Sequence, residues 1–186
     1  MIKVVKKEDY KVSEWSGGVT KEILILPEEG DYSERRFHAR VSSAVVEAKE
    51  SDFTELKGVH RFISLVHGDM ELHINDNEPK ILSPLDIVEF EGEDKVHCIG
   101  KATDFNLMLK GANGRLSVLP IGVKRTALKG GTVLIFAIGA VQVRFSNADP
   151  VELSTGDSCV ITNDDMDYLI YSERTTNVLV AEIEGE

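Results

Sequence analysis

Cysteines and long apolar runs are both scarce in this sequence of 186 residues. The two cysteines, Cys98 and Cys159, lie far apart and form no CxxC pair, which excludes a disulfide framework. Each stands in an apolar, strand-like run, so we expect two buried thiols. The longest apolar run, residues 133–143, is too short to span a bilayer, and the first ten residues contain no apolar signal segment. The sequence therefore predicts a soluble cytoplasmic protein.

Positive charge is also in deficit, with 21 Lys and Arg against 32 Asp and Glu and a net charge of -11. An acidic surface repels phosphate groups, so we expect neither nucleic acid nor a membrane among the partners. Hydrophobic residues make up 42% of the chain, which is enough for a real core. The length suits one large domain or two small ones that are closely joined.

The familiar catalytic motifs are missing from the sequence. There is no GxSxG nucleophile elbow, and Cys98 and His97 are neighbours on a predicted strand, so their side chains point to opposite faces. The segment WSGGVTK (residues 15–21) lacks the spacing of a phosphate-binding loop and runs into a strand-like segment, not a helix. These absences favour a protein without a hydrolytic or nucleotide-binding site.

Metal ligands are equally sparse. The chain has five histidines, none of them in an HxH pair, and the last third of the chain contains none. A metal would need imidazole and carboxylate groups that converge, and only His60, His73 and His97 could form such a cluster. We therefore expect no metal and no other cofactor, with that cluster as the alternative.

The dominant hydrophobic period is two, which is typical of half-buried strands. In residues 69–75, DMELHIN, the side chains of Met70, Leu72 and Ile74 share one face. About a dozen such segments alternate with Gly-, Asn- and Asp-rich turns. Residues 48–58 are the one place where a single helical turn is expected. The pattern predicts an all-β sandwich or barrel fold.

A weak internal repeat refines the fold class. Residues 62–90 and 133–162 follow the same order of strand, glycine turn, strand, loop and strand. We interpret them as two cupin-like β-barrels packed together, a bicupin. The expected units are residues 1–120 and 121–186, and because the second is short of strands, N-terminal strands are candidates to complete it.

Mid-strand cations are the most informative polar feature. His38, Arg40 and Ser42 alternate with small apolar residues, so Arg40 either faces solvent or points into a barrel. Inside a barrel it requires a carboxylate, supplied by Glu22 of the neighbouring strand or by a ligand. Arg61 presents the same alternatives, and Asn106 adds an amide that can bind polar groups.

Five segments resemble, in order and spacing, the motifs of the HutD/Ves family. They are WSGGVTKEI (residues 15–23), FHARVSSAVV (37–46), FTELKGVHR (53–61), LVHG (65–68) and DFNLM (104–108). The resemblance implies a bicupin associated with histidine utilisation or stress, without an established enzyme activity, that senses a small carboxylate of the formylglutamate type. Where the family has Asp before the last Arg of the third motif, this chain has His60, so Arg61 lacks that charge partner. The residues that carry over are Trp15, Gly17, Gly18, Thr20, Glu22, Arg40, Ser42, Arg61, Asp104, Asn106 and Met108.

Three functions compete on these grounds. The first is a non-enzymatic protein that binds a small carboxylate through Trp15, Thr20, Glu22, Arg40, Ser42, Arg61, Asn106 and Met108, with Trp15 either in contact with the ligand or only packed at the barrel rim. The second is a metal-dependent cupin isomerase or dioxygenase, by analogy of fold alone. The third is a protein-interaction role for the acidic loops at residues 89–94 and 162–167. Cupin-like folds also allow a homodimer through an edge strand, although no particular edge is indicated.

Overall fold

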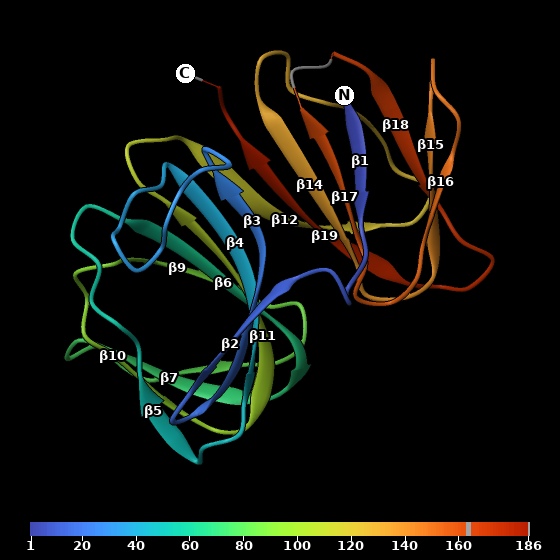
Figure 1. Cartoon of the computed structure of the whole chain (residues 1–186). Coiled ribbons are helices and arrows are strands. Elements are labelled where there is room, and N and C mark those ends of the chain that lie inside the picture. The colour runs from blue at the N-terminus through green and yellow to red at the C-terminus, as the bar shows by residue number, and fades with distance from the viewer. Residues whose placement is uncertain (163–164, 186) are drawn as a thin grey trace. The chain divides into compact units, whose positions relative to one another are not determined.

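The computed structural model describes residues 1–162 and 165–185, and these form nineteen β-strands and no α-helix. No helix in this part of the chain could therefore cross a membrane. The strands divide between two compact units (Figure 1). The first barrel comprises Lys11–Gly111, and the second barrel comprises Met1–Tyr10 together with Ala112–Glu186. The all-β cupin-like fold expected from the period-two pattern is confirmed.

The first barrel contains a six-stranded and a four-stranded antiparallel sheet. The larger sheet has the order β2 (Lys11–Trp15), β3 (Gly18–Leu26), β4 (Ala39–Val46), β11 (Ala102–Leu109), β6 (His60–Gly68), β9 (Ile87–Glu91). The smaller sheet has the order β5 (Glu50–Asp52), β10 (Val96–Ile99), β7 (Met70–Ile74), β8 (Lys80–Leu82). In Figure 1 the two sheets of this barrel curve around a common interior.

The second barrel repeats this arrangement with one five-stranded and one four-stranded sheet. The larger sheet has the order β1 (Ile2–Val5), β17 (Ser158–Thr162), β14 (Thr132–Ala137), β19 (Asn177–Ile183), β12 (Gly114–Pro120). The smaller sheet has the order β13 (Lys124–Thr126), β18 (Asp167–Tyr171), β15 (Val141–Phe145), β16 (Val151–Leu153). The row β4-β11-β6-β9 thus corresponds to β12-β19-β14-β17, and β5-β10-β7-β8 to β13-β18-β15-β16, which agrees with the internal repeat in the sequence.

Two details differ from the sequence-based expectation. The compact units divide at residues 10/11 and 111/112, whereas the sequence placed one boundary at 120/121. Strand β1 pairs with β17, so the chain's first segment lies in the second barrel, for which N-terminal strands were the candidate completion. The expectation of a helical turn in residues 48–58 is wrong. Residues 50–52 form β5 instead, because pairing with β10 provides backbone hydrogen bonds that a single isolated turn lacks.

The interiors of the two barrels differ in chemistry. The second barrel is filled by aliphatic side chains of facing strands, among them Val133, Ile135, Ile161, Val178 and Val180. In the first barrel, aliphatic residues such as Leu65, Met70 and Leu72 fill only part of the interior. Buried polar residues occupy the rest: Arg40, Ser42, Arg61, Asp104 and Asn106. A polar interior has to be satisfied by hydrogen bonds or ion pairs, so this part of the first barrel is the natural place to look for a site.

Asp157 ties the N-terminal segment to the second barrel. Its carboxylate accepts hydrogen bonds from Lys6 Nζ at 2.9 Å, from the Lys7 N–H at 3.1 Å and from the Ser154 N–H at 3.0 Å. Burial acts to raise the pKa of Asp157, but these hydrogen bonds outweigh it, and the net effect lowers the pKa. Asp157 therefore stabilises the fold above its unfolded-state pKa, and this contribution is lost as the pH falls through the folded-state value.

We expect Asp157→Ala to lower the free energy of unfolding by about 1.5–3 kcal/mol at pH 7, the usual value of hydrogen bonds to a charged group. The loss should shrink as the pH is lowered, because protonation removes the same interactions in the unaltered protein. Urea denaturation at pH 7 and at a pH below about 3, where the Asp157 carboxylate becomes protonated in the folded protein as well, measures both effects. Asp149→Ala, at an exposed loop position, is the control, and an equal effect of the two substitutions contradicts the assignment.

Candidate functional site

Three neighbouring strands of the first barrel place the buried polar side chains on one face. Met108 of β11 is the cross-strand neighbour of Arg40 on β4 and of Arg61 on β6. Two residues along β11, Asn106 is the neighbour of Ser42. Because side chains alternate between the faces of a strand, residues two apart in β4 and β11 point into the same interior. Polar residues spaced by two in the sequence thus become one polar surface.

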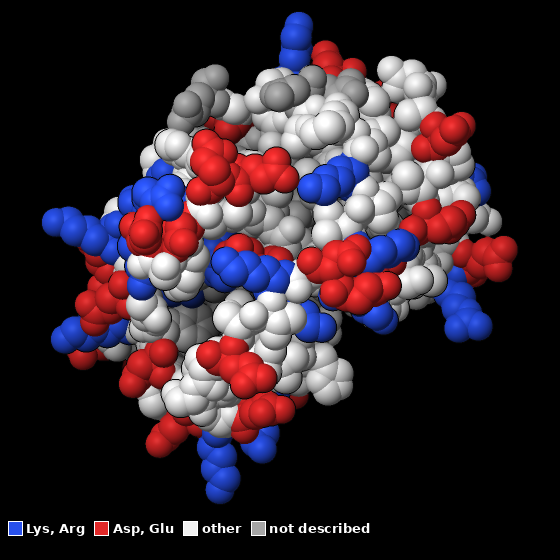
Figure 2. All heavy atoms as spheres, viewed as in Figure 1, with Lys and Arg blue, Asp and Glu red and all other residues white. Residues whose placement is uncertain are grey.

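This surface lines a cavity of about 270 Å³. The volume lies near the lower end of the range for small-ligand sites, roughly 300–1,000 Å³. Figure 2 shows the molecular surface hollowed over the first barrel, and acidic and basic side chains interspersed on the visible face. The lining residues are Ser13, Trp15, Thr20, Tyr32, Arg40, Ser42, Ala44, Val46, Asp52, Phe53, Thr54, Arg61, Asp104, Asn106 and Met108.

The structure brings the predicted binding residues together. Trp15, Thr20, Arg40, Ser42, Arg61, Asn106 and Met108 all line the cavity. Glu22 stands outside the lining and contacts Arg40 instead. Their convergence is a fact of geometry; that they bind a ligand stays a prediction.

Arg40 is paired with a carboxylate and a hydroxyl group. Its Nε donates to Glu22 Oε2 at 2.7 Å, and its Nη1 donates to Ser42 Oγ at 3.1 Å. The guanidinium carbon also lies 4.0 Å from the centroid of the Tyr32 ring. The side chains of Arg40 and Glu22 are 6% and 14% exposed, so this is a nearly buried ion pair. The alternative of a solvent-facing Arg40 is therefore wrong.

Arg61 is buried without such a carboxylate. Its Nη1 donates to the backbone oxygen of Thr54 at 3.3 Å, and its guanidinium carbon lies 5.0 Å and 5.1 Å from the ring centroids of Phe53 and Phe90. Among the described residues, its buried Nε has no hydrogen-bond partner. Burial lowers the pKa of Arg61 to about 10, which still leaves it protonated at neutral pH. Asp104 attracts this guanidinium through its charge, but among the described residues no carboxylate hydrogen-bonds to it.

Two acceptors lie further along β11. Asp104 is 5% exposed, and its Oδ1 accepts a hydrogen bond from the Ala44 N–H at 3.0 Å. Burial raises the pKa of Asp104 to about 6. Asn106 is 6% exposed, and its Oδ1 has no partner within the described part of the chain. An unpaired buried acceptor is costly, and it marks a position where a ligand could donate a hydrogen bond.

The two glycines of the WSGG segment allow the Trp15 ring and the backbone of the neighbouring strand to approach closely. A side-chain carbon on Gly17 would lie 2.0 Å from the Trp15 ring, and one on Gly18 would lie 1.9 Å from the Val45 carbonyl oxygen. Trp15 itself is 40% exposed and lines the cavity. The two glycines are therefore required for close approach, and Trp15 lies at the mouth of the cavity, on its lining.

Sequence reasoning missed several lining residues. Tyr32 belongs to residues 27–36, which read only as a loop, although its ring stacks on Arg40. Phe53 and Thr54 stand within the third resemblance motif but carry no pattern of their own. Their proximity to Arg61 depends on β5 and the segment after it folding back across the barrel. The resemblance to the DFNLM motif was the one available signal for Asp104.

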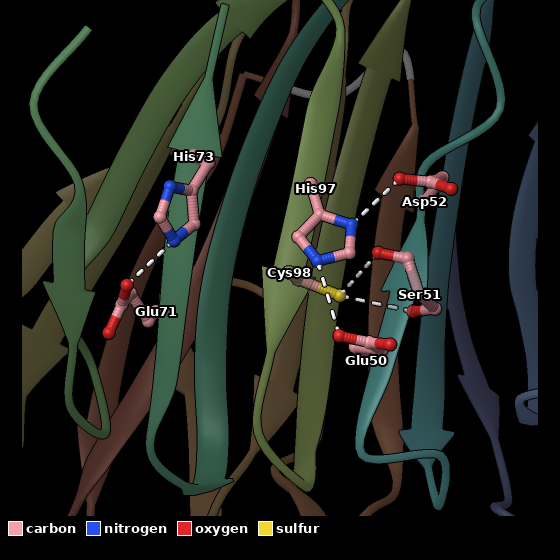
Figure 3. Close-up of polar contacts among 7 residues, drawn as sticks. All are labelled: Glu50, Ser51, Asp52, Glu71, His73, His97 and Cys98. Carbon is pink, nitrogen blue, oxygen red and sulfur yellow. Dashed lines mark hydrogen bonds and ion pairs between the residues drawn. The ribbon is translucent and has the colours of Figure 1, made fainter.

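The histidines of the metal alternative do not assemble. His60 Nδ1 lies 2.8 Å from Glu91, whereas His73 and His97 are cross-strand neighbours on β7 and β10. In Figure 3, His73 contacts Glu71 at 2.6 Å and His97 contacts Asp52 at 2.8 Å. Each imidazole thus has its own carboxylate, and within residues 1–162 and 165–185 no three His, Cys, Asp or Glu residues converge as a metal site. The cluster of His60, His73 and His97 is therefore not formed.

The acidic loops are only partly described. In residues 89–94, Asp94 accepts a hydrogen bond from the Glu91 N–H at 2.9 Å and one from Asn75 Nδ2 at 2.7 Å. This carboxylate therefore stabilises its own turn. In the second acidic loop, residues 163 and 164 lie outside the described residues.

Comparison with known proteins points to one family. The HutD family model matches residues 7–179. Similar solved structures include the conserved protein of unknown function PA5104 from Pseudomonas aeruginosa PAO1, with 23% identity, a TM-score of 0.88 and 100% of both chains covered. HutD from Pseudomonas fluorescens SBW25, in a formate condition, has 24% identity, a TM-score of 0.83 and the same coverage. The nickel(II) complex of the pirin YhhW from Escherichia coli has 12% identity, a TM-score of 0.66 and also the same coverage. None of the curated proteins matches the sequence.

The Arg40–Glu22 pair generates a stability prediction. We expect Glu22→Ala to lower the free energy of unfolding by about 3–5 kcal/mol, because it leaves a buried guanidinium without its counter-charge. Glu34→Ala is the matched control. It removes the carboxylate from the Glu34–Arg36 pair, which is equally short at 2.6 Å but exposed, so we expect a loss of about 0–1 kcal/mol. Urea denaturation measures both, and equal losses contradict the burial argument.

Asp104 generates a pH prediction. Its raised pKa means that the folded state binds the proton more readily than the unfolded chain, so stability falls as the pH rises from about 4 to about 6 and stays lower above that. We expect Asp104→Asn to raise the free energy of unfolding at pH 7.5 by up to about 3 kcal/mol, from roughly two pH units at about 1.4 kcal/mol each. The difference between variant and unaltered protein, measured by urea denaturation, should vanish near pH 4. A variant that is less stable at pH 7.5 refutes this.

Proposed function

Because the chain belongs to the HutD family, and because its first barrel encloses a polar cavity, we propose that it binds a small carboxylate there. The observation that carries the proposal is Arg61, a buried cation with no carboxylate in hydrogen-bonding contact among the described residues. A ligand carboxylate would supply the missing counter-charge and accept hydrogen bonds from the guanidinium. Such charge-assisted bonds contribute about 1.5–3 kcal/mol each.

The surroundings of Arg61 support this assignment. Phe53 and Phe90 lie next to each other against the guanidinium and make its surroundings apolar on that side, which strengthens its attraction for an anion. Arg40 adds a second positive charge nearby, although Glu22 balances it. Formate is the simplest probe, since the related HutD from Pseudomonas fluorescens was studied in a formate condition. Formylglutamate, the ligand type implied by the family resemblance, belongs in the same series.

We propose binding, in a regulatory role, rather than catalysis. Ser42 Oγ, the hydroxyl nearest to Arg40, accepts a hydrogen bond from that cation and is not activated by a base. The metal-dependent alternative rests on similarity of fold to proteins such as the nickel-bound pirin, and no observation in this chain favours it. The link to histidine utilisation or stress, the homodimer and the cytoplasmic location stay predictions.

Arg61→Met tests the proposal without removing the packing between the two phenylalanines. We expect millimolar formate or acetate to raise the melting temperature of the unaltered protein and to change the fluorescence of Trp15, the sole tryptophan, with formylglutamate as the dicarboxylate of the series. Both responses should be lost in Arg61→Met and kept in Arg36→Met, since Arg36 is exposed. An equal response of Arg61→Met and the unaltered protein rejects carboxylate binding at this site.

A further inference from the structure

The polar groups of the cavity follow an order along the strands. Arg40 and Arg61 flank Met108 at one end. Asn106 lies two residues further along β11, and Asp104 lies two residues beyond Asn106. At about 3.3 Å per residue, the row of Asn106 is roughly 7 Å from the row of the arginines. The cavity therefore changes, over the length of a small molecule, from a cationic end to an end with the unpaired Asn106 Oδ1 and the buried Asp104 carboxylate.

At the cationic end there is room for one anionic group. The charge of Arg40 is already balanced by Glu22, at 2.7 Å. The buried Asp104 attracts Arg61 through its charge, but no carboxylate among the described residues hydrogen-bonds to Arg61, and its Nε has no partner there. A second carboxylate on the ligand would have to lie toward the buried Asp104, whose own charge repels it. The charges thus favour a monocarboxylate over a dicarboxylate.

At the other end the cavity offers acceptors. Asn106 Oδ1 is buried and has no hydrogen-bond partner among the described residues, and the Asp104 carboxylate lies beyond it. A ligand that leaves this buried acceptor without a hydrogen bond binds more weakly than a ligand that donates one to it. An ester or ether oxygen at this position adds a second acceptor, whereas an N–H group provides the missing bond.

From this order we propose that the ligand is a monocarboxylate with a neutral N–H donor a few bonds away, its carboxylate on Arg61 and its N–H on Asn106 Oδ1. The inference rests on the proposed function, because it assumes that the same cavity binds a carboxylate. It adds the chemical class of the ligand, for which short N-acyl amino acids with one carboxylate are the simplest representatives.

Matched amide and ester probes test the inference on the unaltered protein. N-acetyl-β-alanine and 3-acetoxypropanoate differ only in N–H against O, and N-acetylglycine and acetoxyacetate form a shorter pair. In titrations followed by Trp15 fluorescence, we expect at least one amide to bind about tenfold or more tightly than its ester, because a site built around a hydrogen bond rejects the analogue that cannot make it. Equal affinities within both pairs overturn the inference.

The variant Asn106→Leu tests whether Asn106 is the residue that distinguishes the amide probes from the ester probes. Replacing an amide whose buried oxygen is unpaired by an apolar group of similar shape should not destabilise the fold, which a melting curve checks. In this variant we expect the amide and ester affinities to become equal, through weaker binding of the amide. If Asn106→Leu keeps the full preference, the donor does not bind Asn106, and the inference fails. If it does not fold, the comparison on the unaltered protein still decides.

The two proposals fail in distinguishable ways. Arg61→Met should weaken amide and ester probes alike, by about tenfold or more, as expected for loss of a charge-assisted bond. If Arg61→Met loses binding of both the amide and the ester probe, but the unaltered protein binds the two probes equally well, the proposed function stands and the N–H donor is rejected. No binding by the unaltered protein at millimolar concentration, or binding unaffected by Arg61→Met, rejects both. N-acetylaspartate, with a second carboxylate, should bind more weakly than N-acetyl-β-alanine, and tighter binding contradicts the charge argument.

Discussion

Burial of two guanidinium groups inside the first barrel is the constraint on which its interior depends. A buried cation is tolerated only when it is paired or surrounded by polarizable and polar groups. Arg40 meets this condition with Glu22 and Ser42 at hydrogen-bonding distance and with the Tyr32 ring. Arg61 meets it only in part, through Phe53, Phe90 and one backbone oxygen. The difference between these two arginines separates a structural ion pair from a candidate binding group.

The second barrel shows how unusual this interior is for the architecture. The two barrels share the same strand order, yet aliphatic residues such as Val133, Ile135, Val178 and Val180 fill the interior of the second. A largely apolar interior is therefore sufficient for the fold. In the first barrel the equivalent strands β6 and β11 carry Arg61, Asn106 and Asp104 instead. Because the fold does not require these polar residues, ligand binding is the simplest explanation for their presence in the first barrel.

Several features of the site could be read from the sequence because they are local. The period of two placed Arg40 and Ser42 on one face, and Asn106 and Met108 on another, before any pairing was known. The family motifs then placed these segments in one site, and the adjacency of two consecutive strands made Glu22 one of two candidate partners for Arg40, the other being a ligand carboxylate. Tyr32 and Phe53 could not be found in this way, since a loop and a short edge strand carry no period that shows where their rings pack.

The sequence by itself determined the all-β class, the duplicated cupin-like topology and the family, because alternation, turn residues and ordered motifs are written in consecutive residues. Only the tertiary structure decided that a carboxylate hydrogen-bonds to Arg40 but, among the described residues, none to Arg61, that Asn106 Oδ1 lacks a partner there, and that those residues form no metal site from the histidines. It also decided that residues 1–10 belong with residues 112–186. The physical reason is that charge balance and hydrogen-bond satisfaction depend on distances of a few ångströms between strands remote in sequence, and no local pattern encodes those distances.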